Sequence, residues 1–323
     1  MKFIQECPEF VQHFQLDDSV AIISVQTEFM RTLFGAVASV DDEKNNKING
    51  LHDDHDDEDD EDKVLVHERP SQLNVELQST LPTIFNHGMI SDAAHKFFHA
   101  GKLLQTCCYN EELHRWQPIL MSWTGKQNKE TYASHFFTLF GSIVGQLKLN
   151  NVDIQLSTFQ SIIATVVDFS DAQRAGFQLA YQKFLTSTEY GIQFQIREWE
   201  LSSLPYQFPS AEEHYSVAIG LLKGCRLHWK KSVTRVSQNH HVIPPEKQSE
   251  FHGYIDDLFS AETIESFTDM KELIESTFPN TADWLDWWSK DEHGGLLFPI
   301  LQSQNFEHLE GVYLFSLSNC RNL

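Results

Sequence analysis

Asp168, in the stretch VVDFSDAQRAGF, is the residue most suited to chemistry. It follows a β-branched run, residues 161–167, that predicts a buried strand, and it precedes a helix predicted over 172–185. Open α/β sheets bind ligands at the carboxyl ends of their strands, so an acid at this point is suited to holding a metal ion. An aspartate in front of a helix can also accept backbone N–H bonds as its cap, although Ser170 or Asp171 could do so equally well. Both interpretations stay open on these residues alone.

Cys225 and His228 form a second pair, because a spacing of three residues brings both onto one face of a helix predicted over 217–236. Thiolate and imidazole groups are zinc ligands, but a closed zinc site needs four ligands. The nearest further candidates are His240 and His241. We therefore expect a packing or hydrogen-bonding pair and regard zinc as the weaker interpretation.

The same helical region carries the best DNA-facing patch of the sequence. Its basic residues are Lys223, Arg226, Lys230, Lys231 and Arg235. A solvated helix face is the alternative interpretation, because charged side chains on a helix usually face water.

The surrounding elements predict a mixed α/β domain that positions Asp168. Residues 102–109 and 117–123 predict two strands joined by a polar turn, which favours an antiparallel hairpin. Residues 129–146 predict a helix, since their apolar side chains recur near a spacing of 3.6. Further helices are expected at 247–259, 261–277 and 282–289.

The last of these helices contains three tryptophans, Trp284, Trp287 and Trp288, whose spacing predicts one common face. We expect this face to pack in the core. Stacking on nucleic-acid bases is the alternative interpretation.

Composition limits the classes of function. The chain of 323 residues has a formal charge of −22, and residues 53–62 hold nine carboxylates in ten positions. This charge argues against a stand-alone, high-affinity grip on nucleic acid, which needs many lysines and arginines at the phosphates. Residues 37–63 lack large apolar side chains and predict a disordered linker. No stretch is long and apolar enough to predict a membrane span, and five sparse cysteines favour a reducing compartment.

Taken in order, several motifs resemble the core of a Mutator-like (MULE-type) DDE transposase over roughly residues 85–315. They are Asp92 in ISDAAHKFF, the hairpin LLQTCCYNEELHRWQPILMSW, Asp168 in VVDFSDAQRAGF, the segment GCRLHWKKSVTRV, and WLDWW before a late glutamate. The resemblance implies an RNase H-like fold: a mixed five-stranded sheet of order 3-2-1-4-5, with a helical insertion before the third acidic residue.

The resemblance also implies a catalytic triad. Asp92 matches the first acid, Asp168 the second and Glu307 the third, with Glu310 as the competing assignment. Such carboxylates would hold Mg²⁺ or Mn²⁺ in a two-metal site for DNA cleavage and strand transfer. Cys225 and His228 match the C-x-x-H of the family.

Five ranges follow from this resemblance: a short N-terminal segment (1–36), an acidic disordered linker (37–63), the first part of the core (64–213), a helical insertion with the CxxH helix and the tryptophans (214–300), and the C-terminal end of the core (301–323). The chain ends soon after the third acid, so we expect a truncated or domesticated copy. The family implies nuclear localisation and transposon-end DNA as partner, and leaves a homo-oligomer open. The alternative is a catalytically inactive remnant that binds DNA or protein.

Overall fold

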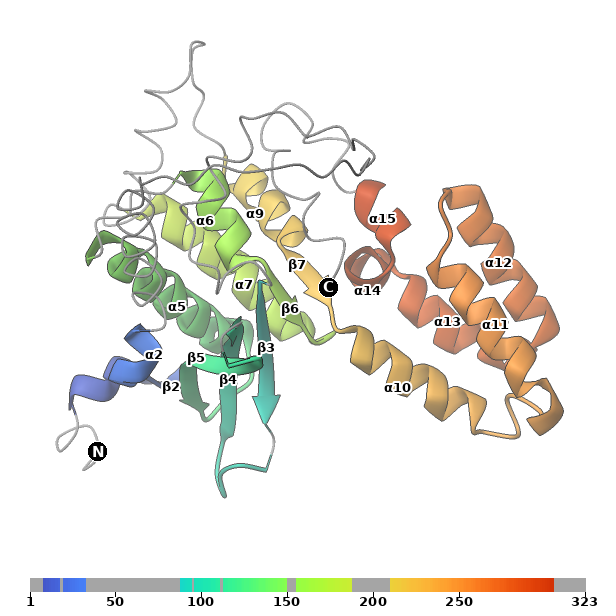
Figure 1. Cartoon of the computed structure of the whole chain (residues 1–323), viewed down its shortest axis with the longest axis horizontal. Helices are drawn as coiled ribbons and strands as arrows, with labels where there is room; N and C mark the ends of the chain where they lie inside the picture. Colours follow the sequence, from blue (N-terminus) through green and yellow to red (C-terminus); the bar gives the residue numbers. More distant parts are fainter. Residues whose placement is uncertain are drawn as a thin grey trace, which may run out of the picture.

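The computed structural model describes residues 8–17, 20–32, 88–94, 96–110, 113–149, 155–187 and 210–304. Within them, seven strands form one mixed sheet in the order β1-β2-β5-β4-β3-β6-β7 (Figure 1). The strands are β1 (Val11–Leu16), β2 (Ala21–Val25), β3 (Met89–Ala94), β4 (Lys102–Asn110), β5 (Arg115–Thr124), β6 (Thr165–Val167) and β7 (Leu222–Gly224). The fold is therefore mixed α/β, as the sequence predicts.

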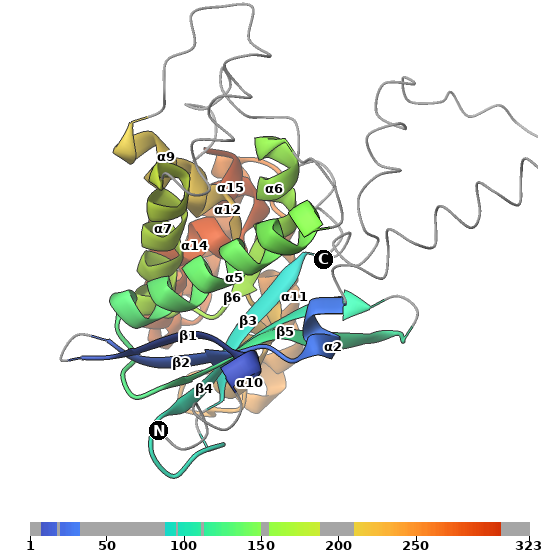
Figure 2. The same ribbon diagram turned by 90° about the vertical axis from the view of Figure 1, so that its left-hand side faces the viewer.

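Helices lie on one face of this sheet and beside its β7 end. The first group is α5 (Lys129–Leu149), α6 (Leu156–Ile163), α7 (Asp171–Thr186) and α9 (Ala211–Gly220), and Figure 2 shows these helices on the same side of the strands. The second group, here called the helical module, is α10 (Arg226–Ser237), α11 (Gln248–Phe259), α12 (Ile264–Thr277), α13 (Ala282–Ser289), α14 (Asp291–Leu297) and α15 (Pro299–Gln304). Shorter pieces are α2 (Glu28–Thr32) and the 3₁₀ turns η1 (Pro8–Phe10), η3 (Pro245–Lys247) and η4 (Pro279–Thr281).

The direction of the strands changes in the middle of the sheet. Strands β1, β2, β5, β4 and β3 pair antiparallel, whereas β3 pairs parallel with β6 and β6 pairs parallel with β7. The predicted hairpin is confirmed as β4 and β5, and the helices predicted over 129–146 and 172–185 are confirmed as α5 and α7. Three parallel strands therefore end at a common edge.

The sheet has seven strands where five were expected. The two additional strands, β1 and β2, form a hairpin, and β2 pairs with β5 through partners such as Ile23 and Trp123. The N-terminal residues thus belong to the same sheet as the rest of the fold. The expected acidic linker, 37–63, lies outside the described residues.

Two boundaries predicted from the sequence are wrong. Residues 161–163 close α6, so only Thr165–Val167 remain as strand β6. The helix predicted over 217–236 is interrupted, because Leu222–Gly224 pair with β6 as strand β7. Gly224 fits beneath the ring of Phe169, where an added Cβ would lie 2.6 Å from ring carbons. The apolar side chains of α9, β7 and α10 together resemble a single helical stripe in the sequence.

The described residues form two hydrophobic cores. Between the sheet and its helices, phenylalanine rings pack edge to face or stack, namely Phe136, Phe140, Phe159, Phe177 and Phe184. The helical module has its own core around Trp229, Phe251, Phe278, Trp288 and Phe298. Phe169 packs against both cores, which joins the module to the sheet.

A row of buried polar side chains, here called the polar ladder, crosses the sheet beneath α5. It consists of Thr165, Ser91, Thr106, His135, Ser122 and Ser24, with successive oxygen or nitrogen atoms 2.7 to 3.4 Å apart. Burial lowers the pKa of His135 to about 3, so its imidazole is neutral at physiological pH and can both donate and accept a hydrogen bond. The ladder therefore satisfies polar groups that would otherwise be buried without partners.

None of the helices in the described part of the chain combines the length and apolarity needed to cross a bilayer.

Candidate functional site

Asp92 lies in β3, and Asp168 directly follows the neighbouring parallel strand β6. The last paired residues of β3 and β6 are Ile90 and Val166, and each aspartate follows two residues later. Neighbouring strands are about 4.8 Å apart, so this register brings the backbones of the two acids close together, Asp92 two residues before the end of β3 and Asp168 just after the end of β6. Asp92 is exposed, whereas Ser91 on the opposite face is buried in the polar ladder. Asp92 therefore faces away from α5.

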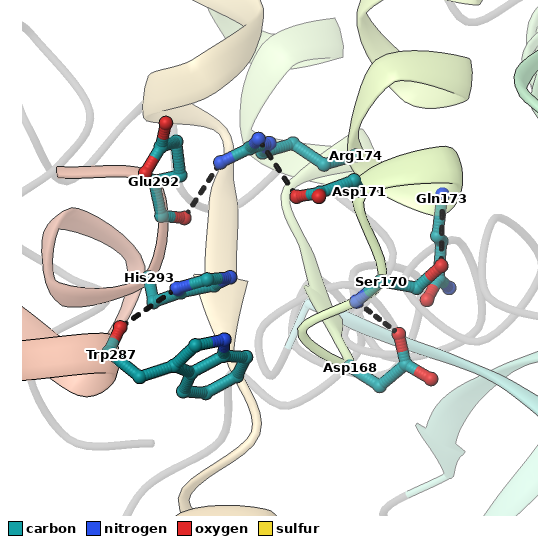
Figure 3. Close-up of polar contacts among 8 residues, drawn as sticks. All are labelled: Asp168, Ser170, Asp171, Gln173, Arg174, Trp287, Glu292 and His293. Carbon is teal, nitrogen blue, oxygen red and sulfur yellow. Dashed lines mark hydrogen bonds and ion pairs between the residues drawn. The ribbon is translucent and has the colours of Figure 1, made fainter. Parts of the chain in front are cut away.

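Each carboxylate is oriented by a nearby backbone N–H group. Oδ1 of Asp92 accepts from the N–H of Ala93 at 2.7 Å, and Oδ1 of Asp168 accepts from the N–H of Ser170 at 2.8 Å (Figure 3). The side chain of Ser170 caps α7 by accepting from the N–H of Gln173 at 3.4 Å. Ser170, not Asp168, is thus the N-cap, and Asp168 supports the turn in front of the helix.

The negative charges of both aspartates affect the pKa of Tyr132, which lies on α5. Burial raises the pKa of Tyr132, and the negative charges of Asp168 and Asp92 raise it further, whereas hydrogen bonds to Gln127 and Ser170 lower it. Both aspartates therefore add to the negative charge around this hydroxyl.

Gly176 allows α7 to approach α5 closely beside this tyrosine. A Cβ at Gly176 would overlap the Cβ of Tyr132 and would lie 2.9 Å from the backbone oxygen of Lys129. The glycine in the stretch VVDFSDAQRAGF therefore has a packing role. It sets how deeply Tyr132 lies beneath the start of α7.

Gln173 holds the start of α7 against β3. Its side chain is buried, and its Nε2 donates to the backbone oxygen of Ser91 at 3.1 Å, one residue before Asp92. Gln173 lies in the first turn of the helix predicted from the sequence, where no local signal indicates this contact. Gln173 thus fixes the distance between β3, which carries Asp92, and the turn that carries Asp168.

The expected third acid, Glu307 or Glu310, lies outside the described residues, which end at residue 304. Among the described residues, no group of three or more histidine, cysteine, aspartate or glutamate side chains is arranged to hold a metal ion. Two oriented carboxylates at one edge are hard oxygen donors, and such donors suit Mg²⁺ or Mn²⁺ better than softer metals. The donor set of Asp92 and Asp168 thus fits the expected class of ion.

Cys225 and His228 lie at the start of α10, next to the same edge of the sheet. Cys225 is the N-cap residue, its N–H donates to the backbone oxygen of Val167 at 3.0 Å, and its carbonyl accepts from the N–H of His228 at 3.0 Å. The Nδ1 atom of His228 is buried and has no hydrogen-bond partner. In the described ranges no third metal-binding side chain joins the pair.

Four of the five basic residues expected to face DNA are exposed on α10. They are Arg226, Lys230, Lys231 and Arg235, whereas Lys223 is half-buried in β7. The guanidinium of Arg226 also lies 4.3 Å from the centre of the Phe259 ring, a cation–π contact. Because α10 begins directly after β7, this basic helix starts at the edge that carries the two aspartates.

The tryptophans of α13 divide into two kinds. Trp284 and Trp288 pack around Trp229, and both indole N–H groups donate to the hydroxyl of Ser232, at 2.8 and 3.3 Å. Trp287 is 38% exposed and stacks on His293, with ring centres 3.8 Å apart (Figure 3). Core packing therefore describes Trp284 and Trp288, but not Trp287.

Comparison of the chain with known protein families, curated proteins and solved structures finds no match. A functional assignment must therefore be argued from the residues of the site.

Proposed function

We propose that this chain is a transposase-derived protein of the Mutator-like type with an RNase H-like core, and that Asp92 and Asp168 hold divalent cations for phosphoryl transfer on DNA. The observation that carries the proposal is the register of the parallel strands β3 and β6, which places Asp92 in β3 level with Asp168, the residue that directly follows β6. Transposon-end DNA is the proposed substrate, and the nucleus is the proposed location.

The order of the central strands supports the RNase H-like assignment. Counted from β3 as the first strand, the segment β5-β4-β3-β6-β7 of the sheet reads 3-2-1-4-5. In this order the first and fourth strands are parallel neighbours, and these two strands carry the proposed first and second acids. The β1–β2 hairpin extends the sheet beyond the five strands of this pattern.

Bound Mg²⁺ or Mn²⁺ would supply an activated water or 3′-hydroxyl and would stabilise the leaving oxygen during in-line displacement at phosphorus. The role of the protein groups is to position the two negatively charged carboxylates. The Ala93 and Ser170 N–H groups fix the two carboxylates, and Gln173 fixes the elements that carry them. Glu307, or Glu310 in its place, is the proposed third acid.

The second candidate function is a catalytically inactive remnant that binds DNA through the exposed basic residues of α10. The observation that favours it is the position of this helix, which starts next to the two acids and carries four exposed cations. Such a protein would bind DNA without nicking it.

A nicking assay separates these functions. Purified protein is incubated with supercoiled plasmid and Mn²⁺, and relaxation is compared with that of Asp168→Asn and Asp171→Asn. Asp171 is three residues from Asp168, is exposed, and pairs with Arg174 at 3.0 Å, so it is a matched carboxamide control. We expect nicking by the parent protein and by Asp171→Asn, and its loss in Asp168→Asn.

Equal nicking by Asp168→Asn and the parent would refute the catalytic role of Asp168. DNA binding with no nicking by any of the three proteins would favour the inactive remnant.

A further inference from the structure

Two phenylalanine side chains project from the loop that joins β3 to β4. Phe97 is 66% exposed and Phe98 is 38% exposed, and their rings meet edge to face with centres 4.9 Å apart. Adjacent exposed aromatic residues are unusual on a protein surface unless they contact something, because their burial would release ordered water. This aromatic pair is therefore a candidate binding surface.

The loop returns to the sheet through a fixed turn. Gly101 has a φ of +84°, and an added Cβ would lie 2.5 Å from the backbone oxygen of Thr124 and 2.6 Å from Nε1 of Trp123. That Nε1 atom also donates to the backbone oxygen of Ala100 at 2.8 Å. The end of the loop is thus hydrogen-bonded to β5. This bond holds in place the segment that follows the aromatic pair.

The pair is separated from the proposed cation site by only a short length of chain. The loop leaves the sheet at the carboxyl end of β3, the strand that carries Asp92. Phe97 follows Asp92 by five residues, which spans at most about 17 Å of extended chain. A strand of nucleic acid whose phosphate is at Asp92 and Asp168 therefore has neighbouring nucleotides within reach of the loop.

The local charge favours an anionic ligand. The sequence from 93 to 110 has no aspartate or glutamate, and it includes Lys96, Lys102 and two histidines, in a chain with a formal charge of −22. Lysines beside exposed aromatic rings suit single-stranded nucleic acid, because the cations attract phosphates and the rings stack on bases of any sequence.

We infer that Phe97 and Phe98 form a stacking platform for unpaired DNA bases next to Asp92 and Asp168. This inference rests on the proposed function and deepens it, because it gives the site a preference for a strand that is open on one side of the reacting phosphate. Double-stranded DNA offers no exposed base face to such a platform, and it is the natural competing ligand.

The test measures DNA binding without cleavage. Fluorescence anisotropy of a labelled oligo(dT) strand of about 16 nucleotides, in EDTA, is recorded with the parent protein and with the double variant Phe97→Ala/Phe98→Ala. Phe14→Ala is the matched control, since Phe14 on β1 is 39% exposed, about the same as Phe98. We expect the double variant to bind at least about tenfold more weakly, and the control to bind like the parent.

A second variant guards against loss of structure. Phe97→Trp keeps a stacking ring, so it should retain binding, and fluorescence of the new indole should be quenched by oligo(dT). The inference is overturned if the parent fails to bind oligo(dT), or if the double variant binds it as tightly as the parent. Preference for duplex DNA that is insensitive to both substitutions overturns it as well.

Failure of this inference is distinguishable from failure of the proposed function. Mn²⁺ binding that depends on Asp168, together with oligo(dT) binding indifferent to Phe97, would remove the platform and keep the cation site. Oligo(dT) binding that depends on Phe97, without any Mn²⁺ binding, would keep the platform and remove the cation site.

Discussion

The two cores of this protein bury their polar groups in different ways. Beneath the sheet, the polar ladder joins strands β2, β5, β4, β3 and β6 through hydroxyl groups and one neutral histidine. In the helical module, aromatic rings dominate, and two indole N–H groups share the hydroxyl of Ser232. Directional hydrogen bonds fix strand register more strictly than ring packing does, so the ladder lies where position matters for Asp92.

This comparison predicts that the stability of the helical module depends most on how its side chains pack. Trp229→Ala should cost about 3–5 kcal/mol of unfolding free energy, because Trp229 stacks on Trp284 at 5.3 Å and contacts the rings of Trp288 and Phe298. Urea denaturation followed by circular dichroism measures the loss. Amide hydrogen exchange should reveal the largest increase in α10 to α13. An equal increase across β3 and β6 would contradict the separation into two cores.

The stability of the sheet region should instead depend on the hydrogen bonds of the polar ladder. Thr106→Val keeps the shape of the side chain but removes the hydroxyl that joins Ser91 to Nε2 of His135. We expect a loss of about 1–3 kcal/mol, since buried partners are left unsatisfied. The same exchange at Thr234, which is exposed on α10, is the control and should change stability by less than about 0.5 kcal/mol. Equal effects in the two variants would argue against the ladder as a stabilising feature.

The ladder also predicts a pH dependence with a defined sign. The pKa of His135 is about 3 in the folded state and 6.5 in the reference state, so between these pH values the folded protein binds fewer protons than the unfolded chain. Its contribution is complete above the reference pKa and declines below it, by about 1 kcal/mol between pH 6.5 and about pH 5.5.

Urea denaturation of the parent and of His135→Gln at both pH values measures this term, and the difference between the two proteins isolates it. Burial also lowers the pKa of His13 and His214, so the variant should keep part of the pH dependence. An unchanged slope in His135→Gln would contradict the account.

Long periodic segments explain why much of the fold was predictable. The apolar stripe of 129–146 and the two strand-like runs around a polar turn in 102–123 each carry a strong local signal, and both are observed. Strands of three residues carry almost no local signal. The sequence therefore predicts β6 too long and places β7 inside a helix. Pairing of the β1–β2 hairpin with β5 is a tertiary choice that no local pattern reveals.

The residues of the candidate site were likewise predictable only where the signal is local in the sequence. Asp168 was identifiable because a strand, an acid and a helix follow each other in the sequence, and Asp92 was identified through the family resemblance. Gln173 and Tyr132 were not assigned roles, since their contacts join elements that are distant in sequence. Serines and threonines at inward-facing strand positions were the missed signal for the polar ladder.

The proposed function requires that Asp92 and Asp168 bind one divalent cation between them. Electron paramagnetic resonance of Mn²⁺ with the parent, Asp92→Asn, Asp168→Asn, the double variant and Asp171→Asn tests it directly. We expect each single substitution at the site to weaken binding by about tenfold or more, and the double variant to lose less than the sum, because both acids act on one ion. Asp171→Asn should bind like the parent. Mn²⁺ binding unchanged in Asp92→Asn and Asp168→Asn, or absent from the parent, would contradict the claim.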